Sequence, residues 1–294
     1  MLSLHTNAAS LSAQSSLSKT QNSLSNSMTR LSTGYRINSS MDDAAGLQIA
    51  TRLKAQSSGM AVAMRNTQNS ISMMQTADGA LDEVNNILTR MKDLATQAAD
   101  GSSSDDDKTA MDAEYNSLTD ELSNIFSNTS FGGTKLLSSD GKLAGEDGIT
   151  FQIGSDKSET MTAKFNTELG DDGVIGKIKA AVDDKLATDG TGDASENTVL
   201  STDANGAIDN LNEAIKSVST LRSKLGAVSN RLDHVYNNLS NMSSNTQAAT
   251  GRIMDVDFAT ESASMTSNQM LMQAGTAMLK QTNSMSSMVM SLLQ

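Results

Sequence analysis

The chain has no proline, no cysteine and no tryptophan, and aromatic residues make up 3% of its 294 residues. Average usage would place roughly 15 prolines in a chain of this length. Because an interior proline costs a helix about 3 kcal/mol, their absence favours long uninterrupted helices. Without cysteine there can be no disulfide, no thiolate metal site and no cysteine nucleophile.

The two histidines, His5 and His234, are expected at surface or seam positions rather than as metal ligands. Asp255, Asp257 and Glu261 form the one acidic cluster of interest, and we interpret it as a solvated, helix-capping turn. No Walker loop, dinucleotide fingerprint or nucleophile elbow is present. The sequence therefore predicts a protein that is not an enzyme and has no catalytic residue, cofactor site or metal site.

Charge is distributed unevenly around a net charge of −12. Residues 100–206 carry 22 acids against 8 lysines, whereas residues 262–294 carry only Lys280. An acidic middle argues against nucleic acid as a partner. No stretch reaches the roughly 18 apolar residues of a membrane span. The N-terminus does not have the pattern of a secretory signal peptide, so we expect no membrane association and, if the protein leaves the cell, another export route.

The dominant positive feature is a heptad pattern from Leu211 to Val256. Two rows of apolar residues repeat every seven positions, which predicts a coiled-coil helix that packs on a partner helix. The predicted rod seam consists of Leu211, Val218, Leu221, Leu225, Val228, Leu232, Val235, Leu239, Met242 and Ile253. A second heptad stretch, from Met60 to Ala98, is the expected antiparallel mate.

Both ends of the chain predict polar helices with narrow apolar rows. The predicted inner seam consists of Leu4, Leu11, Leu24 and Leu31, with Leu17 one place early, and of Leu271, Met278, Met285 and Leu292. Such thin stripes give little stability to an isolated helix. We expect the two ends to pair with each other and to complete their packing on other copies.

Between the heptad stretches, residues 149–153 and 161–165 alternate in polarity around Gly154–Lys157, which predicts a small β-hairpin. Residues 166–206 combine a short helix near Val174–Leu186 with Gly, Asp and Thr loops, and we interpret them as a variable surface insertion. The predicted fold is mainly α, a long antiparallel coiled-coil bundle with a β-hairpin region and paired helical termini. The predicted domains are 1–40 with 257–294, 41–165 with 207–256, and the insertion.

Three stretches resemble one family, the bacterial flagellins. They are Leu31–Ser40 followed by Asp42–Leu47; Arg252-Ile253, Asp255 and Asp257–Glu261; and Gln273–Leu279 with the closing Ser291–Leu293. The resemblance implies a short flagellin without large outer domains, which polymerises into the filament used for motility. It also implies unfolded export by the flagellar type III system to the cell exterior, and encounters with an export chaperone, hook-junction proteins and cap proteins.

The resemblance extends to a face that the vertebrate Toll-like receptor for flagellins recognises. The matching positions are Leu88, Arg90, Leu94, Gln97 and Glu114, while Lys92, Asp93 and Leu118 depart from the usual pattern. Two alternatives share the same general features: a hook–filament junction protein, and another secreted coiled-coil protein of type III export. Seeded filament growth would distinguish these three possibilities.

Overall fold

The computed structural model describes residues 7–182 and 198–292, with side chains described up to Met285. Most of the described chain is helical, as predicted. The elements are α1 (Ala8–Thr33), α2 (Ala44–Ala98), α3 (Asp105–Asn128), β1 (Ser130–Phe131), β2 (Thr134–Lys135), β3 (Ile149–Gln152), β4 (Thr160–Ala163), α4 (Asn166–Leu169), α5 (Val174–Ala181), α6 (Val199–Met254) and α7 (Phe258–Leu292).

The chain divides into two compact units, one built from both ends of the chain and one from its continuous middle. Residues 1–57 and 244–294 form the terminal unit, and residues 58–243 form the central unit. Both boundaries fall inside long helices, α2 and α6, rather than at the predicted positions 40/41 and 256/257. The predicted domain boundaries instead coincide with the turns that separate α1 from α2 and α6 from α7.

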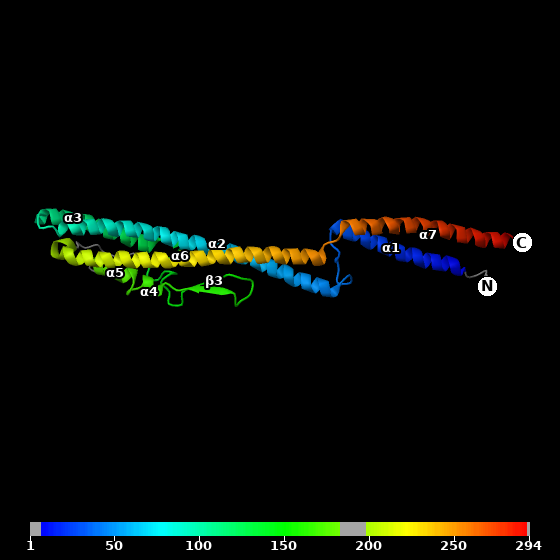
Figure 1. Ribbon diagram of the computed structural model, residues 1–294, viewed down its shortest axis with the longest axis horizontal. Coiled ribbons are helices and arrows are strands. Elements are labelled where there is room, and N and C mark those ends of the chain that lie inside the picture. Colours follow the sequence, from blue (N-terminus) through cyan, green and yellow to red (C-terminus); the bar gives the residue numbers. More distant parts are fainter. Residues whose placement is uncertain (1–6, 183–197, 293–294) are drawn as a thin grey trace. The chain divides into compact units, whose positions relative to one another are not determined.

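The central unit is built on the antiparallel pair that the heptads predict. Met60 and Ala63 of α2 cluster with Leu239 of α6, whereas Arg222 of α6 contacts Asp78 of α2, so residue numbers rise in one helix as they fall in the other. Helix α3 returns along α2 and adds Tyr115, Leu122 and Phe126 to the core (Figure 1). All three of these side chains are fully buried.

The predicted β-hairpin is confirmed, but β3 ends one residue earlier than predicted, and β4 starts one residue earlier and ends two residues earlier. Strands β3 and β4 pair antiparallel with Phe151 opposite Met161, and both side chains face the core. The turn of this hairpin packs on α2 at Gly59, where an added Cβ would lie 2.6 Å from the Cβ of Ser155. A side chain at residue 59 would therefore push the hairpin away from the helix. A smaller hairpin, β1–β2, turns at Gly132-Gly133.

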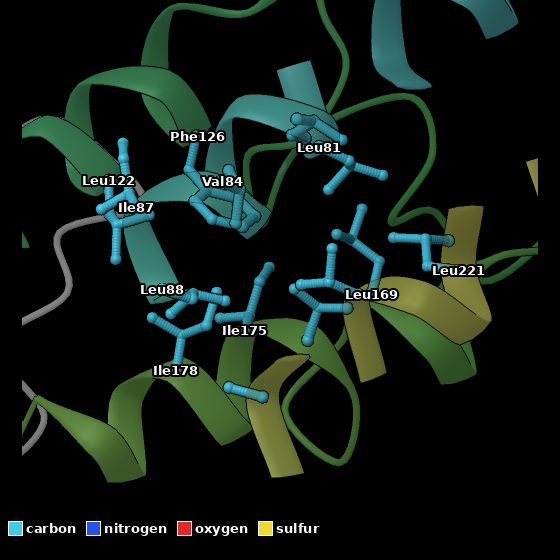
Figure 2. Close-up of a cluster of buried hydrophobic side chains, with 14 of the residues drawn as sticks. Leu81, Val84, Ile87, Leu88, Leu122, Phe126, Leu169, Ile175, Ile178 and Leu221 are labelled. Atoms are coloured by element: carbon cyan, nitrogen blue, oxygen red, sulfur yellow. The ribbon is translucent and has the colours of Figure 1, made fainter. Parts of the chain in front are cut away.

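The prediction that residues 166–206 form a surface insertion is wrong for its described parts. Leu169 of α4 and Val174, Ile175 and Ile178 of α5 are buried in the central core, and Figure 2 shows Ile175 and Ile178 beside Leu88 of α2. The start of α6 also contributes, through Leu200 and Ala204. The apolar spacing of α5 covers one helix face, which buries it against α2. Residues 183–197 lie outside the described part of the chain.

Candidate assembly surface

The terminal unit holds two helices, α1 and α7, that run side by side in opposite directions (Figure 1). Their least exposed residues recur at intervals of three and four, the spacing of a two-helix seam. On α1 these are Ser10, Ala13, Leu17, Thr20, Leu24, Ser27 and Leu31; on α7 they are Glu261, Met265, Asn268, Met272, Gly275, Leu279 and Thr282. Half of the seam is polar or lacks a side chain, so it buries little apolar area.

Few polar contacts reinforce this seam. At one end the Asn7 side-chain amide donates to the Thr282 carbonyl at 3.4 Å, and at the other Arg30 pairs with Glu261 at 3.6 Å. Between them Leu17 approaches α7 at Gly275, where an added Cβ would lie 3.2 Å from the Leu17 Cδ1. Because Gly275 has no side chain, the two helices can come close together at this point.

The predicted inner seam therefore coincides only in part with the α1–α7 contact within the subunit. Leu24 is buried and Leu31 half-buried, but Leu17 belongs to their seven-residue row and Leu11 does not. Leu11 is 64% exposed, because it lies one position, about 100° of helix rotation, from the seam position Ser10. Leu4 lies outside the described residues.

On α7 the predicted row does not face α1 at all. Leu271, Met278 and Met285 are 56%, 65% and 57% exposed, and the neighbouring row of Met265, Met272 and Leu279 takes the seam. Leu292 is the last residue of the helix, and its side chain is outside the described set. The predicted row is thus apolar but free of any partner within the described chain.

We call this free face of α7 the outer stripe. It comprises Met270, Leu271, Ala274, Ala277, Met278 and Met285, all exposed. A contiguous apolar face of this kind on a helix indicates an interaction surface. It carries no nucleophile or acid–base group, so its capacity is association rather than catalysis.

Two of the stretches singled out in the sequence, Leu31–Ser40 and the one that begins at Arg252, meet in the segments that connect α1 to α2 and α6 to α7. Tyr35 and Asp255 form an antiparallel bridge, and the Arg36 N–H donates to the Met254 carbonyl at 2.6 Å. The Arg36 guanidinium also donates to the Ile253 carbonyl at 3.0 Å. Gly34 ends α1 in the left-handed conformation, with φ of 77°, which a residue with a Cβ adopts only with strain. These contacts join the two crossing segments.

Two aspartates at this crossing fix the local backbone through hydrogen bonds, and Asp257 caps a helix start as the sequence analysis predicts. Asp42 accepts backbone hydrogen bonds from Asn38 and Ser39, at 3.0 and 2.9 Å, and these bonds lower the pKa of its carboxyl group. Asp257 accepts from the Thr260 hydroxyl and the Ala259 N–H at the start of α7, which lowers its pKa as well. Both carboxylates therefore stay ionised and hold turns in place.

The predicted rod seam is largely buried in the central unit. Leu211, Val218, Leu221, Leu225 and Leu232 are fully buried, with Val228 and Leu239 nearly so and Val235 half-buried. Met242 is the exception at 37% exposed, because Ser243 takes the buried position next to it. Ile253 is half-buried within the terminal unit.

The predicted receptor face divides into exposed and buried residues. Arg90 and Gln97 of α2 and Glu114 of α3 are exposed, and the Arg90 guanidinium donates to the Glu114 carboxylate at 2.9 and 2.6 Å. Leu88 and Leu94, by contrast, are buried at 0% and 2% exposure in the core between these helices. Their side chains cannot touch a partner while the central unit is folded.

Sequence reasoning missed two polar anchors of the central unit. Arg222 of α6 bridges Asp78 and Asp82 of α2 at 2.9 and 2.6 Å, and the Asp78-to-Asp82 spacing of one helical turn signals such a pair. The second anchor is Asp112, which is 5% exposed on α3 and accepts from the start of α6. No pattern along the chain links residue 112 to residue 200.

Two other kinds of site are missing from the described residues. Within residues 7–182 and 198–292, no three His, Asp or Glu side chains cluster as they would to hold a metal ion. In the same part of the chain, no helix combines the length and the hydrophobicity that a membrane span requires. The outer stripe is therefore the candidate surface for binding a partner.

Two family models match this chain, one in its N-terminal part and one in its C-terminal part. The bacterial flagellin N-terminal helical region matches residues 4–142, and the bacterial flagellin C-terminal helical region matches residues 208–293. The chain belongs to the bacterial flagellin family. It is accordingly a structural subunit of the flagellar filament, which lies outside the cell, and not an enzyme. Self-assembly into a helical filament is what this family does.

Individual relatives agree with this assignment. Flagellin A of Vibrio anguillarum is 35% identical over 377 aligned positions, and the alignment covers all of both chains. Because the present chain has 294 residues, the alignment places gaps in it opposite residues of the relative. Polar flagellin F of Vibrio parahaemolyticus is 34% identical, with 99% of each chain covered. A putative flagellar hook-associated protein from the same species shares the fold, with a TM-score of 0.57 at 19% identity over 73% of this chain and 100% of its own.

Proposed function

We propose that this flagellin polymerises through the outer stripe of α7, which packs against the terminal helices of neighbouring copies. The single observation that carries the proposal is the exposure of Leu271, Met278 and Met285 on a helix whose other face already has a partner. Exposed Leu11 and Met28 on α1, at 64% and 57%, supply a second apolar surface for the same contact. Contacts between unlike faces give an open helical polymer when their rotation does not close a ring.

In this proposal α1 and α7 form the inner domain of the filament. The terminal helices suit a crowded core because they carry few charges: α7 beyond Ser262 has only Lys280. Stacked copies of a charged helix would repel one another at short range, at a cost that a low dielectric increases. A nearly uncharged helix avoids this cost.

We further propose that the chain is exported unfolded by the flagellar type III system and meets an export chaperone, hook-junction proteins and cap proteins on the way. Three features support this. The thin α1–α7 seam costs little to open, the chain has no disulfide to break, and it has no proline that could isomerise slowly during refolding. Such a chain can be extended in transit and refold outside the cell.

A recognition role for the vertebrate Toll-like receptor for flagellins remains a proposal that rests on Arg90, Gln97 and Glu114. These three residues are exposed in the central unit, and the Arg90–Glu114 pair presents a fixed pattern of donors and acceptors. Leu88 and Leu94 support the backbone beneath them. A receptor-reporter assay on purified monomer tests this role, with Arg90→Ala as the variant and Lys54→Ala, at an exposed position of the same helix outside this face, as its control.

The assembly proposal is tested by seeded polymerisation of Leu271→Asp. A carboxylate buried in an apolar contact is strongly disfavoured, so we expect the critical concentration to rise on the order of a hundredfold. Leu271→Met keeps the residue apolar and should assemble as the unaltered chain does. Circular dichroism should show the same thermal transition for the central unit in both variants, because residue 271 contacts none of its core.

Four outcomes decide between the candidates. Long filaments from the unaltered chain and from Leu271→Met, with none from Leu271→Asp, support the proposal. Normal filaments from Leu271→Asp would overturn the assignment of the stripe. A single terminal layer on seeds, with no elongation, would favour a hook–filament junction protein, and a monomer that never binds seeds would favour another secreted coiled-coil protein.

A further inference from the structure

Methionine is unusually frequent in this chain, at 19 of 294 residues, and its placement is uneven. In the central unit Met60, Met74 and Met91 are buried, at 1%, 0% and 0% exposure. On α7 the three methionines of the outer stripe, Met270, Met278 and Met285, are 60%, 65% and 57% exposed. The thioethers of these three residues are thus exposed at the surface where the proposed function needs an apolar contact.

We propose that Met270, Met278 and Met285 form an oxidation site that controls assembly: their conversion to methionine sulfoxide by peroxide-class oxidants blocks filament growth, and reduction restores it. This inference rests on the proposed role of the outer stripe. It concerns the free subunit before it enters the filament, when these side chains are open to solvent.

The reaction needs no group from the protein other than the thioether. The sulfur attacks one oxygen of hydrogen peroxide and gives up an electron pair, so that a sulfur–oxygen bond forms and the oxygen–oxygen bond breaks. The second peroxide oxygen leaves as water after proton transfer. Sulfur is oxidised by two electrons, and the peroxide is reduced by two. Methionine sulfoxide reductases reverse this step with electrons from a thiol reductant.

The physical effect follows from the change in polarity. A methionine side chain is flexible and apolar and fills irregular gaps at an interface, whereas the sulfoxide is polar and accepts hydrogen bonds. A neighbouring helix without a donor at that point would leave the new oxygen unsatisfied. Because the three residues point away from the α1–α7 seam, the modification leaves the contacts within the subunit in place.

Exposure also determines which methionines react first. Met41, in the turn before α2, is the most exposed at 94%, but it lies outside the stripe. It therefore provides the matched control: it should oxidise as readily as the stripe and leave assembly unchanged. Met60, Met74 and Met91 should stay unmodified while the central unit is folded.

The experiment exposes the full chain, as monomer, to graded hydrogen peroxide and removes the peroxide before seeded polymerisation. Peptide mass spectrometry reports the sulfoxide at each methionine, including Met288 and Met290, whose side chains lie beyond the described set. We expect the critical concentration to rise at least about tenfold as the three stripe residues become oxidised, because each buried sulfoxide loses its solvation. Treatment with methionine sulfoxide reductases should return it to the untreated value.

Two sets of variants assign the effect to the stripe. Replacing Met270, Met278 and Met285 together by leucine should preserve assembly and remove most of the sensitivity to peroxide, whereas Met41→Leu should remain as sensitive as the unaltered chain. Met278→Gln, which introduces a polar amide without any oxidant, should impair assembly by itself. Should the triple leucine variant fail to assemble untreated, reductase rescue and Met278→Gln decide the question.

Each result has a defined meaning. Normal assembly of a chain that is fully oxidised at the three positions overturns the inference, and so does equal peroxide sensitivity of the triple leucine variant. Protection by Met41→Leu would place the sensitive site elsewhere and overturn it too. Failure of untreated protein to elongate seeds would count against the proposed assembly function instead, so the two ideas fail separately.

Discussion

The buried carboxylate of Asp112 accepts a hydrogen bond from the backbone N–H of Leu200 at 2.9 Å, although 88 positions separate the two residues. Its other oxygen accepts from the backbone N–H of Ser201 at 3.2 Å and from the Ser201 hydroxyl. An aspartate of α3 thus caps the start of α6 in the way that a local N-cap residue would. The bond holds the beginning of the long return helix against the core.

We expect Asp112→Ala to destabilise the central unit by about 1–3 kcal/mol, because it leaves buried backbone donors without an acceptor. Urea unfolding measures this loss as a lower midpoint at an unchanged slope. Asp120→Ala, at an exposed position on the same helix, should shift the midpoint by less than about 0.5 kcal/mol. Equal stability of the two variants would show that the cap contributes nothing.

Tyr115, one turn from Asp112, predicts how stability depends on pH in alkali. Its hydroxyl donates to the Ala181 carbonyl at 2.8 Å in a buried site. Burial, and then the charge of Asp112, raise the pKa of Tyr115 above its ordinary value of 10.0. The unfolded chain therefore releases this proton at a lower pH than the folded chain does. Stability from this group is complete below pH 10 and falls as the pH rises further.

Tyr115→Phe should separate the two contributions. At pH 7 we expect a loss of about 1 kcal/mol from the missing hydrogen bond. Above pH 10 the difference between the chains should shrink, because the variant has no buried proton to release. Denaturation midpoints measured from pH 7 to the alkaline limit test this, with Tyr35→Phe at an exposed residue as the control. A constant difference across that range would contradict the argument.

The parts of the fold that follow a repeating pattern could be predicted from the sequence, and those that depend on distant contacts could not. The seam residues from Leu211 to Leu239 repeat every seven positions, so a period alone places them inward. The row through Leu271 and Met278 was identified as apolar, but which of two adjacent rows of α7 faces α1 depends on α1 itself, and Leu271 and Met272 are both apolar. Likewise, no local signal shows that Asp112 reaches Leu200.

Residues 166–206 show a different limit of prediction from the sequence. Residues Val174 to Val182 have an apolar face, yet the surrounding Gly, Asp and Thr residues suggested a solvent-exposed insertion. The composition of this segment indicates its loops, but it does not reveal the short helix α5 between them. Burial of Ile178 depends on α2 and α3, which the chain supplies far away in sequence.

The core role of α5 predicts a large effect for a single truncation. Ile178 is 0% exposed, so Ile178→Ala should cost about 2–5 kcal/mol through lost burial and a residual cavity. Lys177→Ala, next to it, removes only an exposed ion pair with Glu213 at 2.6 Å and should cost less than about 1 kcal/mol. Thermal unfolding followed by circular dichroism compares them. A small effect of Ile178→Ala would restore the interpretation of this segment as a dispensable insertion.

The α1–α7 pair should be the least protected part of the free subunit and should become protected in the filament. Its seam alternates apolar residues with Ser27, Thr20, Asn268 and other polar side chains, so it buries little apolar surface. Ordering each backbone residue costs roughly 1–2 kcal/mol, and a two-helix contact covers only one face of each helix. Isolated helices with a narrow stripe open readily. We therefore expect fast amide exchange in α1 and α7 of the monomer.

Amide hydrogen exchange on monomer and filament measures this directly, because local opening sets the rate. The central unit provides the internal reference: amides near Leu88 and Leu221, both fully buried, should be protected in both states. In the filament, amides of α7 near Met278 should slow by several orders of magnitude, since neighbouring copies would cover the outer stripe. Leu271→Asp, kept monomeric, should show the fast pattern at all concentrations. Strong protection of α1 and α7 already in the monomer would mean that the pair folds without neighbours, and assembly could then no longer be described as coupled folding.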